Sequence, residues 1–258
     1  MGLNGRVALV VGGGRGIGRA VCERLAADGC TVAVAGRTPA ALEAVRDGLR
    51  DAGHEATCHE LDLADLASVE PAVKRVVAEH GRVDVLVNAA GISYVAPVAL
   101  SNLERCEEVL RVNLLGAFAL SRAVVRPMIR QKAGRIVHVG SISGDVGAPY
   151  NAIYAASKAG LGGLVRSLAL EVAALGITVN AVQPGTVRTE LFEATHGARA
   201  KLKGITLEAQ ERAMEADSPQ RRLVRPDEVA AAVSYLAGEG AAAVNGHLLD
   251  VDGGRSVA

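Results

Sequence analysis

The sequence predicts an α/β fold, a single Rossmann-type doubly wound parallel sheet of about seven strands with helices on both faces. Strand-like and helix-like segments alternate along all 258 residues. The strand-like runs are continuously apolar, as residues 7–11 are, which is typical of parallel strands covered on both faces. Half of the residues are hydrophobic but only 2% are aromatic, and 30 are glycine, which favours close packing of helices on a sheet. Such regular alternation implies right-handed crossovers between parallel strands.

Each element is predicted from its own local pattern. The apolar runs predict strands at residues 7–11, 31–35, 55–61, 83–87, 135–139, 177–182 and 247–251. A helical pattern runs from a glycine-rich loop to residue 28, and others cover residues 39–52, 66–80, 103–131, 151–175 and 226–236. Pro39 stands at the start of its helix, where a missing N–H removes no helical hydrogen bond.

One polar stretch, residues 189–220, breaks this alternation after the sixth strand. We expect it to form a helical flap over the active site; the alternative is a surface excursion. No linker, repeat or low-complexity tract divides the chain, so residues 1–258 are expected to form a single domain.

Composition excludes several classes of protein. The formal net charge is zero, from 28 basic and 28 acidic residues, so nothing suggests a nucleic-acid or membrane-surface partner. The chain has no signal-peptide pattern and no apolar run long enough to cross a membrane. Its four cysteines are scattered and are expected to be small buried hydrophobic residues, which predicts a cytoplasmic protein.

A glycine-rich loop follows the first strand and opens the first helix. Its sequence, from Gly12 through Arg15, Gly16 and Ile17 to Gly18, has the spacing Gly-x3-Gly-x-Gly. Glycines there let the backbone turn tightly and approach a pyrophosphate, whose charge then meets a helix N-terminus. We therefore expect a dinucleotide-binding site at this loop.

The end of the second strand decides which dinucleotide is bound. A carboxylate there would hold the ribose 2′-hydroxyl of NAD, but this position holds Gly36, Arg37 and Thr38. Arg37 can bind a 2′-phosphate through two parallel hydrogen bonds, and Arg15 could reach the same group. The sequence therefore predicts NADP(H) over NAD(H). The alternative is that both arginines are solvated surface residues.

Tyr154 and Lys158 predict an acid–base site. They are four residues apart in a helical pattern and so share one face of the helix. A lysine beside the tyrosine is expected to stabilise the phenolate and to lower the tyrosine pKa towards neutrality. Ser141 ends the fifth apolar strand, at the edge where α/β sheets place their chemistry.

With these residues the chain resembles the short-chain dehydrogenase/reductase family over nearly its whole length. The matching residues are Gly12, Gly16 to Gly18, Asp62, Leu63, Asn88 to Gly91, Asn113, Ser141, Tyr154, Lys158, Pro184, Gly185, Val187, Thr189 and Asp252 to Gly254. The resemblance implies that Asp62 and Leu63 hold the adenine, while Pro184, Gly185, Val187 and Thr189 hold the nicotinamide. It also implies that Asn88, Ala89 and Gly91 brace the fourth strand under the cofactor.

The resemblance further implies a catalytic set of Asn113, Ser141, Tyr154 and Lys158. Ser141 would polarise the substrate carbonyl, Tyr154 would deliver the proton, and Lys158 would also bind the nicotinamide ribose. Asn113 would position a water that relays protons to the lysine. One departure is Val11, where the family usually has a threonine whose hydroxyl braces the loop.

Other polar residues are expected to play smaller parts. Ser143, Tyr94 and Tyr150 are predicted to line the substrate site together with Ser141 and Tyr154. The sequence Cys58-His59-Glu60 resembles a metal site, but it lies in a strand and lacks further ligands, so no metal is expected. His138 is expected to be a buried, hydrogen-bonded core residue.

These observations predict an NADPH-dependent carbonyl or keto reductase that transfers hydride to a ketone, with Tyr154 as general acid. Within the family the chain resembles 3-oxoacyl-carrier-protein reductases and polyketide ketoreductases, which implies a β-keto acyl or polyketide-like substrate. A basic rim of Arg126, Arg130 and Lys132 could meet an acidic acyl carrier protein; the alternative is a solvated helix end. The alternatives are an NADP-dependent alcohol dehydrogenase of a sugar, steroid or cyclic alcohol, and a non-catalytic NADP(H)-sensing protein. The resemblance also implies a homotetramer.

Overall fold

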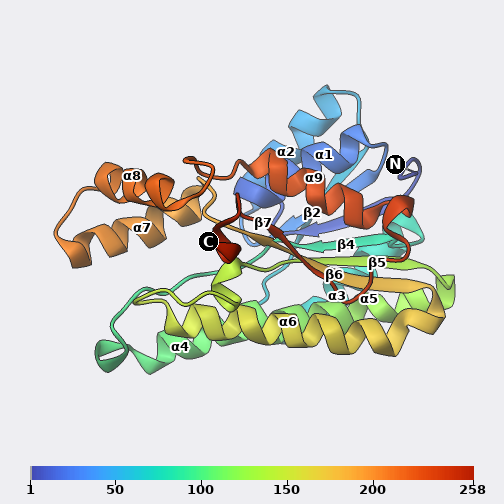
Figure 1. The fold of residues 1–258 in the computed structure, drawn as a ribbon. Helices are drawn as coiled ribbons and strands as arrows, with labels where there is room; N and C mark the ends of the chain where they lie inside the picture. Colours follow the sequence, from blue (N-terminus) through green and yellow to red (C-terminus); the bar gives the residue numbers. More distant parts are fainter. Residues whose placement is uncertain (1) are drawn as a thin grey trace.

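The computed structural model describes residues 2–258, and its centre is a seven-stranded parallel sheet (Figure 1). The spatial order of the strands is β3-β2-β1-β4-β5-β6-β7, and every neighbouring pair is parallel. The strands are β1 (Val7–Val11), β2 (Thr31–Gly36), β3 (Ala56–Glu60), β4 (Val85–Asn88), β5 (Gly134–Val139), β6 (Ile177–Pro184) and β7 (Leu248–Val251). The predicted doubly wound fold is confirmed.

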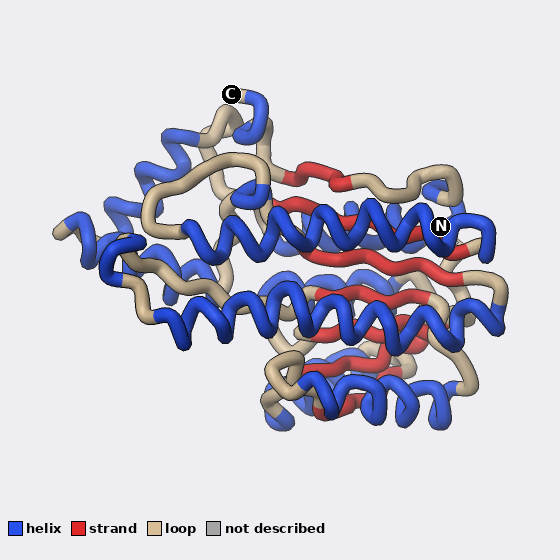
Figure 2. Tube along the Cα trace, turned by 90° about the horizontal axis from the view of Figure 1, so that it is seen from below, coloured by secondary structure: helices blue, strands red, loops and turns tan. Residues whose placement is uncertain are grey.

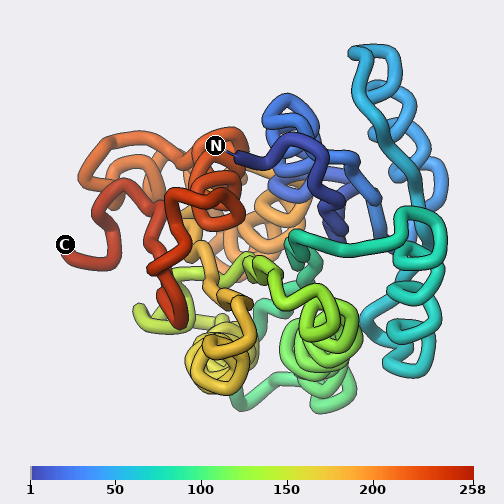
Figure 3. The backbone as a smooth tube through the Cα atoms, turned by 90° about the vertical axis from the view of Figure 1, so that its right-hand side faces the viewer, coloured from blue at the N-terminus to red at the C-terminus, as the bar shows by residue number. Residues whose placement is uncertain are grey.

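The helices cover both faces of this sheet, as the end-on view of Figure 3 shows. They are α1 (Gly16–Ala27), α2 (Pro39–Asp51), α3 (Leu66–His80), α4 (Leu103–Leu110), α5 (Ala117–Gln131), α6 (Ala152–Val172), α7 (Glu190–Lys203), α8 (Leu207–Asp217) and α9 (Pro226–Ala237). One apolar core packs α1, α2 and α9 against the sheet, and a second packs α3, α5 and α6 against the opposite face. Figure 2 shows helices of this second layer running in front of the strands.

Successive side chains along a strand point to opposite faces of the sheet, so a strand can contribute residues to both apolar cores. In β1, Ala8 and Val10 enter the core under α1, whereas Leu9 and Val11 enter the core under α3 and α5. All five residues of β1 are buried, because a strand with helices above and below has no solvent face. This explains why the strands appear in the sequence as continuous apolar runs.

The predicted helix at residues 103–131 is continuous but not uniformly α-helical. Between α4 and α5 the backbone makes a π-helical segment, Arg111–Gly116. The whole helix, Leu103–Gln131, is long and apolar enough to cross a membrane, but 61% of its most apolar window is buried inside the fold. The helix therefore serves as a core element of this domain.

The chain changes its direction of winding at β1, which pairs with β2 on one side and with β4 on the other. In such sheets ligands bind outside the carboxyl ends of the strands at this switch point. The stretch predicted as a flap forms two helices, α7 and α8, that follow the carboxyl end of β6 and project beyond the sheet (Figure 1).

Candidate active site

The glycine-rich loop forms one wall of a pocket at the switch point. Gly12 has φ 82°, and a Cβ built on it would lie 2.6 Å from the backbone nitrogen of Ala90. A Cβ on Gly18 would lie 2.0 Å from the carbonyl oxygen of Gly12. The loop therefore packs directly against its own helix and against the end of β4, as close backbone approach to a ligand requires.

The N-terminus of α1 faces this pocket. Arg15 occupies the N-cap position and, within residues 2–258, its side chain makes no hydrogen bond to the first turn. The first N–H groups of a helix have no partner inside the helix, and the helix dipole attracts anions to that end. This end of the pocket can therefore hold a pyrophosphate.

The outer part of this first pocket lies beyond the end of β2. Arg37 and Thr38 are exposed there, and Arg15, which belongs to the glycine loop, lines the same pocket. Twelve of the predicted cofactor residues line the pocket: Gly12, Arg15, Gly16, Ile17, Gly18, Arg37, Thr38, Asp62, Leu63, Ala89, Gly91 and Thr189. The two arginines beside the β2 end provide the positive charge that a 2′-phosphate needs.

A second pocket opens at the carboxyl ends of β5 and β6. Eleven residues singled out from the sequence line it: Ile17, Ala89, Gly91, Ser141, Ser143, Tyr154, Lys158, Pro184, Gly185, Val187 and Thr189. Five residues line both pockets, namely Ile17, Ala89, Gly91, Thr189 and Leu191. The two pockets therefore meet, so a dinucleotide lying in the first can bring its nicotinamide to the hydroxyl groups in the second.

Ser141 and Tyr154 supply these hydroxyl groups. Ser141 lies just past the end of β5 and its Oγ accepts a hydrogen bond from the backbone nitrogen of Ser143 at 3.1 Å. Tyr154 lies in the first turn of α6. Burial raises the pKa of the Tyr154 phenol, while a hydrogen bond with Ser141 and the positive charge of Arg199 oppose that rise. The phenol therefore holds its proton at neutral pH, as a general acid must.

Lys158 lies one turn beyond Tyr154 and is buried. Its Nζ donates a hydrogen bond to the carbonyl oxygen of Val139 at 2.9 Å and lies 5.7 Å from the centre of the Tyr154 ring. Burial lowers the pKa of Lys158 to about 8. We expected the lysine to lower the tyrosine pKa; in the protein without ligand, burial of the phenol outweighs any such effect, and the net direction is upward.

Asn113 belongs to the π-helical segment and is buried. Its Oδ1 accepts a hydrogen bond from the backbone nitrogen of Ile92, while its Nδ2 donates to the carbonyl of Ile92 and to Ser157 Oγ. A Cβ on Gly91 would lie 3.4 Å from Asn113 Oδ1 and 3.6 Å from Lys158 Nζ. The amide thus lies near the lysine but is held by backbone, so it positions the strand end beside the site.

Four predicted site residues do not line either pocket: Asn113, described above, and Asn88, Tyr94 and Tyr150. Asn88 lies beneath, with its Oδ1 accepting from Ala90 N at 3.3 Å and its Nδ2 3.4 Å from His138 Nδ1. This agrees with a bracing role. Tyr94 and Tyr150 are not among the lining residues, because the Tyr94 hydroxyl accepts from the backbone nitrogen of Asn102 and Tyr150 sits in a turn with φ 65°. The structure therefore gives no support for substrate contact by either tyrosine.

Several residues of the second pocket were missed by sequence reasoning. Phe192, His196 and Arg199 enter it from α7, and Arg255 enters it from the turn after β7. No spacing motif marks them, since they reach the site only because α7 folds back over the carboxyl edge of the sheet. The only available signal was the position of the flap after the sixth strand.

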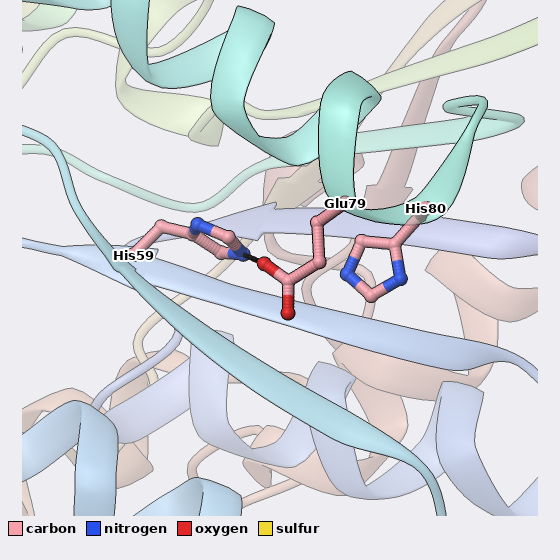
Figure 4. A group of neighbouring side chains, drawn as sticks. All are labelled: His59, Glu79 and His80. Atoms are coloured by element: carbon pink, nitrogen blue, oxygen red, sulfur yellow. Dashed lines mark ion pairs between the residues drawn. The ribbon is translucent and has the colours of Figure 1, made fainter.

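A cluster of possible metal ligands lies away from both pockets. His59 on β3 meets Glu79 and His80 at the end of α3, and one ligand atom from each lies within 4.8 Å of the others (Figure 4). Thr57 Oγ1 lies 2.9 Å from His59 Nε2 and 3.0 Å from His80 Nε2, so one hydroxyl already bonds both rings. The sequence pattern pointed instead to Cys58 and Glu60, neither of which belongs to the cluster.

This chain is similar in sequence and structure to known proteins. The family model for short chain dehydrogenases matches residues 6–199. The 3-oxoacyl-[acyl-carrier-protein] reductase FabG of Escherichia coli (strain K12) is 39% identical over 254 residues, covering 98% of each chain. A solved variant of actinorhodin polyketide ketoreductase with NADPH is 37% identical, with a TM-score of 0.95 and complete coverage of both chains. A putative NAD(P)-dependent gluconate 5-dehydrogenase from Beutenbergia cavernae, solved with NADP, is 39% identical, with a TM-score of 0.91, covering 100% of this chain and 99% of that one.

Proposed function

This chain belongs to the short-chain dehydrogenase family, and we propose that it is an NADPH-dependent ketoreductase acting on a β-keto acyl or polyketide-like ketone. The observation that carries the proposal is the meeting of two pockets. One is built from a glycine loop and a helix N-terminus, and the other holds Ser141, Tyr154 and Lys158. A dinucleotide site that opens onto the hydroxyl groups of Ser141 and Tyr154 is the arrangement that carbonyl reduction needs.

Ser141, Tyr154 and Lys158 each have a separate role in the proposed reduction. The Ser141 hydroxyl binds the ketone oxygen and stabilises the negative charge that develops on it. Tyr154 gives its proton to that oxygen, and its raised pKa keeps the proton in place until then. Lys158, whose pKa lies near 8, holds or releases a proton at Nζ near neutrality and can replenish the phenol. NADPH, when bound, supplies the hydride.

The cofactor preference rests on charge at the end of β2. Arg37 and Arg15 line the outer part of the first pocket, and no carboxylate follows β2 directly. A 2′-phosphate brings two negative charges that arginine binds through paired hydrogen bonds. The actinorhodin ketoreductase was solved with NADPH and the Beutenbergia protein with NADP, which supports the same choice here.

The experiment that tests this function measures NADPH oxidation with a β-keto ester, a bicyclic ketone and an acetoacetyl thioester. Turnover of any of them, lowered about 100-fold or more by Tyr154→Phe, is the expected result. Tyr235→Phe is the matched control, since Tyr235 is an exposed tyrosine on α9. Turnover that is unchanged in Tyr154→Phe would show that Tyr154 is not the general acid. No NADPH oxidation with any of the three ketones would overturn the ketoreductase assignment.

A second function is favoured by one comparison. One solved relative is a putative NAD(P)-dependent gluconate 5-dehydrogenase. The corresponding reading of this chain is an NADP-dependent dehydrogenase of a sugar or cyclic alcohol. NADP⁺ reduction by such alcohols, with no ketone turned over, would establish it.

The oligomeric state, the protein partner, the cellular location and the domain organisation of this chain are also proposals. Exposed apolar side chains on α5 and α6, among them Phe118 and Leu170, support a homotetramer built through these helices. An acyl carrier protein is proposed as a partner by analogy with FabG, although Arg126 of the expected basic rim is already paired with Glu70 at 3.0 Å. Four free cysteines fit a cytoplasmic protein, and the whole chain is proposed to act as one domain.

A further inference from the structure

Arg199 is an arginine without a partner beside the reacting hydroxyls. It lies on α7, lines the second pocket together with Tyr154, and has a buried Nε. Within residues 2–258 its guanidinium makes no hydrogen bond and no ion pair, whereas most arginines of the chain are paired. Arg199 is half-buried as a whole, but its Nε is buried without a hydrogen bond, which is costly for a charged group. A fold that keeps such a guanidinium facing a pocket provides a place for an anion.

The pocket around Arg199 carries only positive charge. Its lining includes Lys158, Arg199 and Arg255, and no aspartate or glutamate belongs to the lining. Arg255 is poised by the turn after β7, where Asp252 accepts hydrogen bonds from the backbone nitrogens of Gly254 and Ser256. Its ion pair with Asp217 is 3.5 Å long, and the Asp217 side chain is 69% exposed, so the pair leaves much of the Arg255 charge available to the pocket.

The same pocket collects buried polar atoms that lack hydrogen bonds. Of the six such side-chain atoms among residues 2–258, four belong to pocket residues: Ser93 Oγ, Asn151 Oδ1, His196 Nδ1 and Arg199 Nε. His196 and Arg199 are three residues apart, so both lie on one face of α7. Burial, with neighbouring positive charges, lowers the pKa of His196 to about 4, so it faces the pocket as a neutral ring. Buried polar groups are normally paired, and unpaired ones gathered in one pocket point to a polar ligand.

We propose that the ketone substrate carries a carboxylate or phosphate group, and that Arg199, assisted by Arg255, is the residue that selects it. The inference rests on the ketoreductase function, because it places the ketone at Ser141 and Tyr154. It narrows the proposed class of β-keto acyl or polyketide-like ketones to those with an anionic group on the side facing α7. A keto acid with a free carboxylate then fits the pocket better than its uncharged ester.

The test compares matched pairs of substrates with NADPH. Acetoacetate, 4-oxopentanoate and 5-oxohexanoate are each assayed against their methyl esters, and dihydroxyacetone phosphate against dihydroxyacetone. In at least one pair the anion is expected to have a kcat/KM about 10- to 100-fold higher, the range of a hydrogen bond between charged groups. Whether a keto acid or the phosphate shows the preference identifies the anionic group as carboxylate or phosphate. Among the keto acids, the chain length with the strongest preference indicates how far the anionic group lies from the ketone carbon when Arg199 binds it.

Variants of Arg199 then test whether this residue causes the preference for the anionic ketone. Arg199→Gln is expected to bring the anion-to-neutral ratio of kcat/KM close to one through a higher KM for the anion, and Arg199→Lys to restore part of it. Arg212→Gln is the matched control, because Arg212 is an exposed arginine on the neighbouring helix α8 and does not line the pocket. The ratio cancels any change in Tyr154 itself, since both substrates of a pair use the same phenol.

A binding measurement gives a second readout. Calorimetric titration of the corresponding hydroxy acid or hydroxyalkyl phosphate into the protein with NADP⁺ is expected to show weaker binding in Arg199→Gln, and unchanged binding in Arg212→Gln. Equal kcat/KM within every pair, with ketones still reduced, would overturn this inference and leave the ketoreductase function standing. A preference that persists in Arg199→Gln would overturn the role of Arg199. Failure to reduce any ketone would instead overturn the proposed function itself.

Discussion

The ammonium group of Lys158 lies 5.7 Å from the centre of the Tyr154 ring, and its hydrogen bond goes to the carbonyl of Val139. The two side chains share one face of α6 but do not form a direct hydrogen bond among the described residues. The pKa of the phenol is raised and that of the ammonium lowered, in each case chiefly by burial. Each group is thereby moved towards its neutral form.

The lowered pKa of Lys158 should make its contribution to the free energy of unfolding increase with pH above about 8. Its pKa is about 8 in the folded protein, against an ordinary value of 10.5. Between these values the unfolded chain binds more protons, so the free energy of unfolding rises with pH from about 8 upwards. Urea unfolding from pH 7 to 9.5 should show the native protein gaining stability relative to Lys158→Met, because the buried thiols of Cys22 and Cys30, whose raised pKa values act in the opposite direction, are common to both proteins. Parallel curves for the two proteins would contradict the lowered pKa.

His138 should make the protein sensitive to acid. The ring is fully buried between Asn88 and Ser121, as expected from the sequence, and burial lowers its pKa from 6.5 to about 4. The unfolded chain takes up this proton first, so stability falls as pH drops from 6.5 to 4, by up to about 3 kcal/mol. Urea unfolding over this range should show a smaller loss in His138→Gln. An identical loss would mean that another group causes the acid sensitivity.

Gly18→Ala should destroy the cofactor loop. The new Cβ would lie 2.0 Å from the carbonyl oxygen of Gly12, so the loop or α1 must shift. Fluorescence titration should show NADPH binding lost or strongly weakened, and the melting temperature should fall. Gly48→Ala is the control, because Gly48 lies inside α2 with no atom within 4 Å of its Cβ position. That change should stabilise the protein by about 0.5–1 kcal/mol. Unaltered NADPH binding by Gly18→Ala would disprove the tight packing of the loop.

Arg37→Asp should reverse the cofactor preference. The carboxylate would repel a 2′-phosphate and could accept a hydrogen bond from a 2′-hydroxyl. The ratio of kcat/KM for NADPH to that for NADH should fall about 10- to 100-fold, the range of a lost charge-assisted hydrogen bond. Arg212→Asp makes the same charge change on the flap, away from the first pocket, and should leave the ratio as it was. An unchanged ratio in Arg37→Asp would show that Arg37 does not contact the cofactor.

Leu170→Glu should weaken the proposed tetramer. Leu170 on α6 is 84% exposed in the single chain, which is unusual for a leucine on a helix of this length. A charge at this position should dissociate the tetramer into smaller species in light scattering. Leu202→Glu, on α7 in the flap, places the same charge on another exposed leucine and should leave the mass unchanged. A native protein that scatters as a 26.5 kDa monomer would contradict the tetramer outright.

Most of the fold could be predicted because its strands are buried on both faces and therefore stand out as apolar runs. Predicted strand and helix ends moved by only a few residues; the strand expected at residues 83–87 is β4 at Val85–Asn88. The π-helical segment at Arg111–Gly116 could not be predicted, since hydrophobic periodicity does not register one extra residue in a turn. Only the buried hydrogen bonds of Asn113 explain why it is there.

The site was predictable where a motif marks it and not where the tertiary fold assembles it. The glycine loop, Ser141, Tyr154 and Lys158 lie at strand ends or in one helix, so local spacing locates them. Arg199 and Arg255 are separated by 56 residues and meet only in the folded chain. His59 and His80 likewise meet because the chain returns along α3 after β3. The direction of the Tyr154 pKa shift was missed because burial is not visible in a helix spacing.

The shared wall of the two pockets has a kinetic consequence. Ile17, Ala89, Gly91, Thr189 and Leu191 border both, so the inner end of the dinucleotide pocket opens into the space that the ketone would fill. A ketone that binds first would block the entry of the nicotinamide. It would also bind to a site that lacks the nicotinamide as one of its walls. We therefore expect compulsory-order turnover, with the coenzyme first to enter and last to leave. NADP⁺ would then compete with NADPH in product-inhibition plots, whereas the alcohol would not.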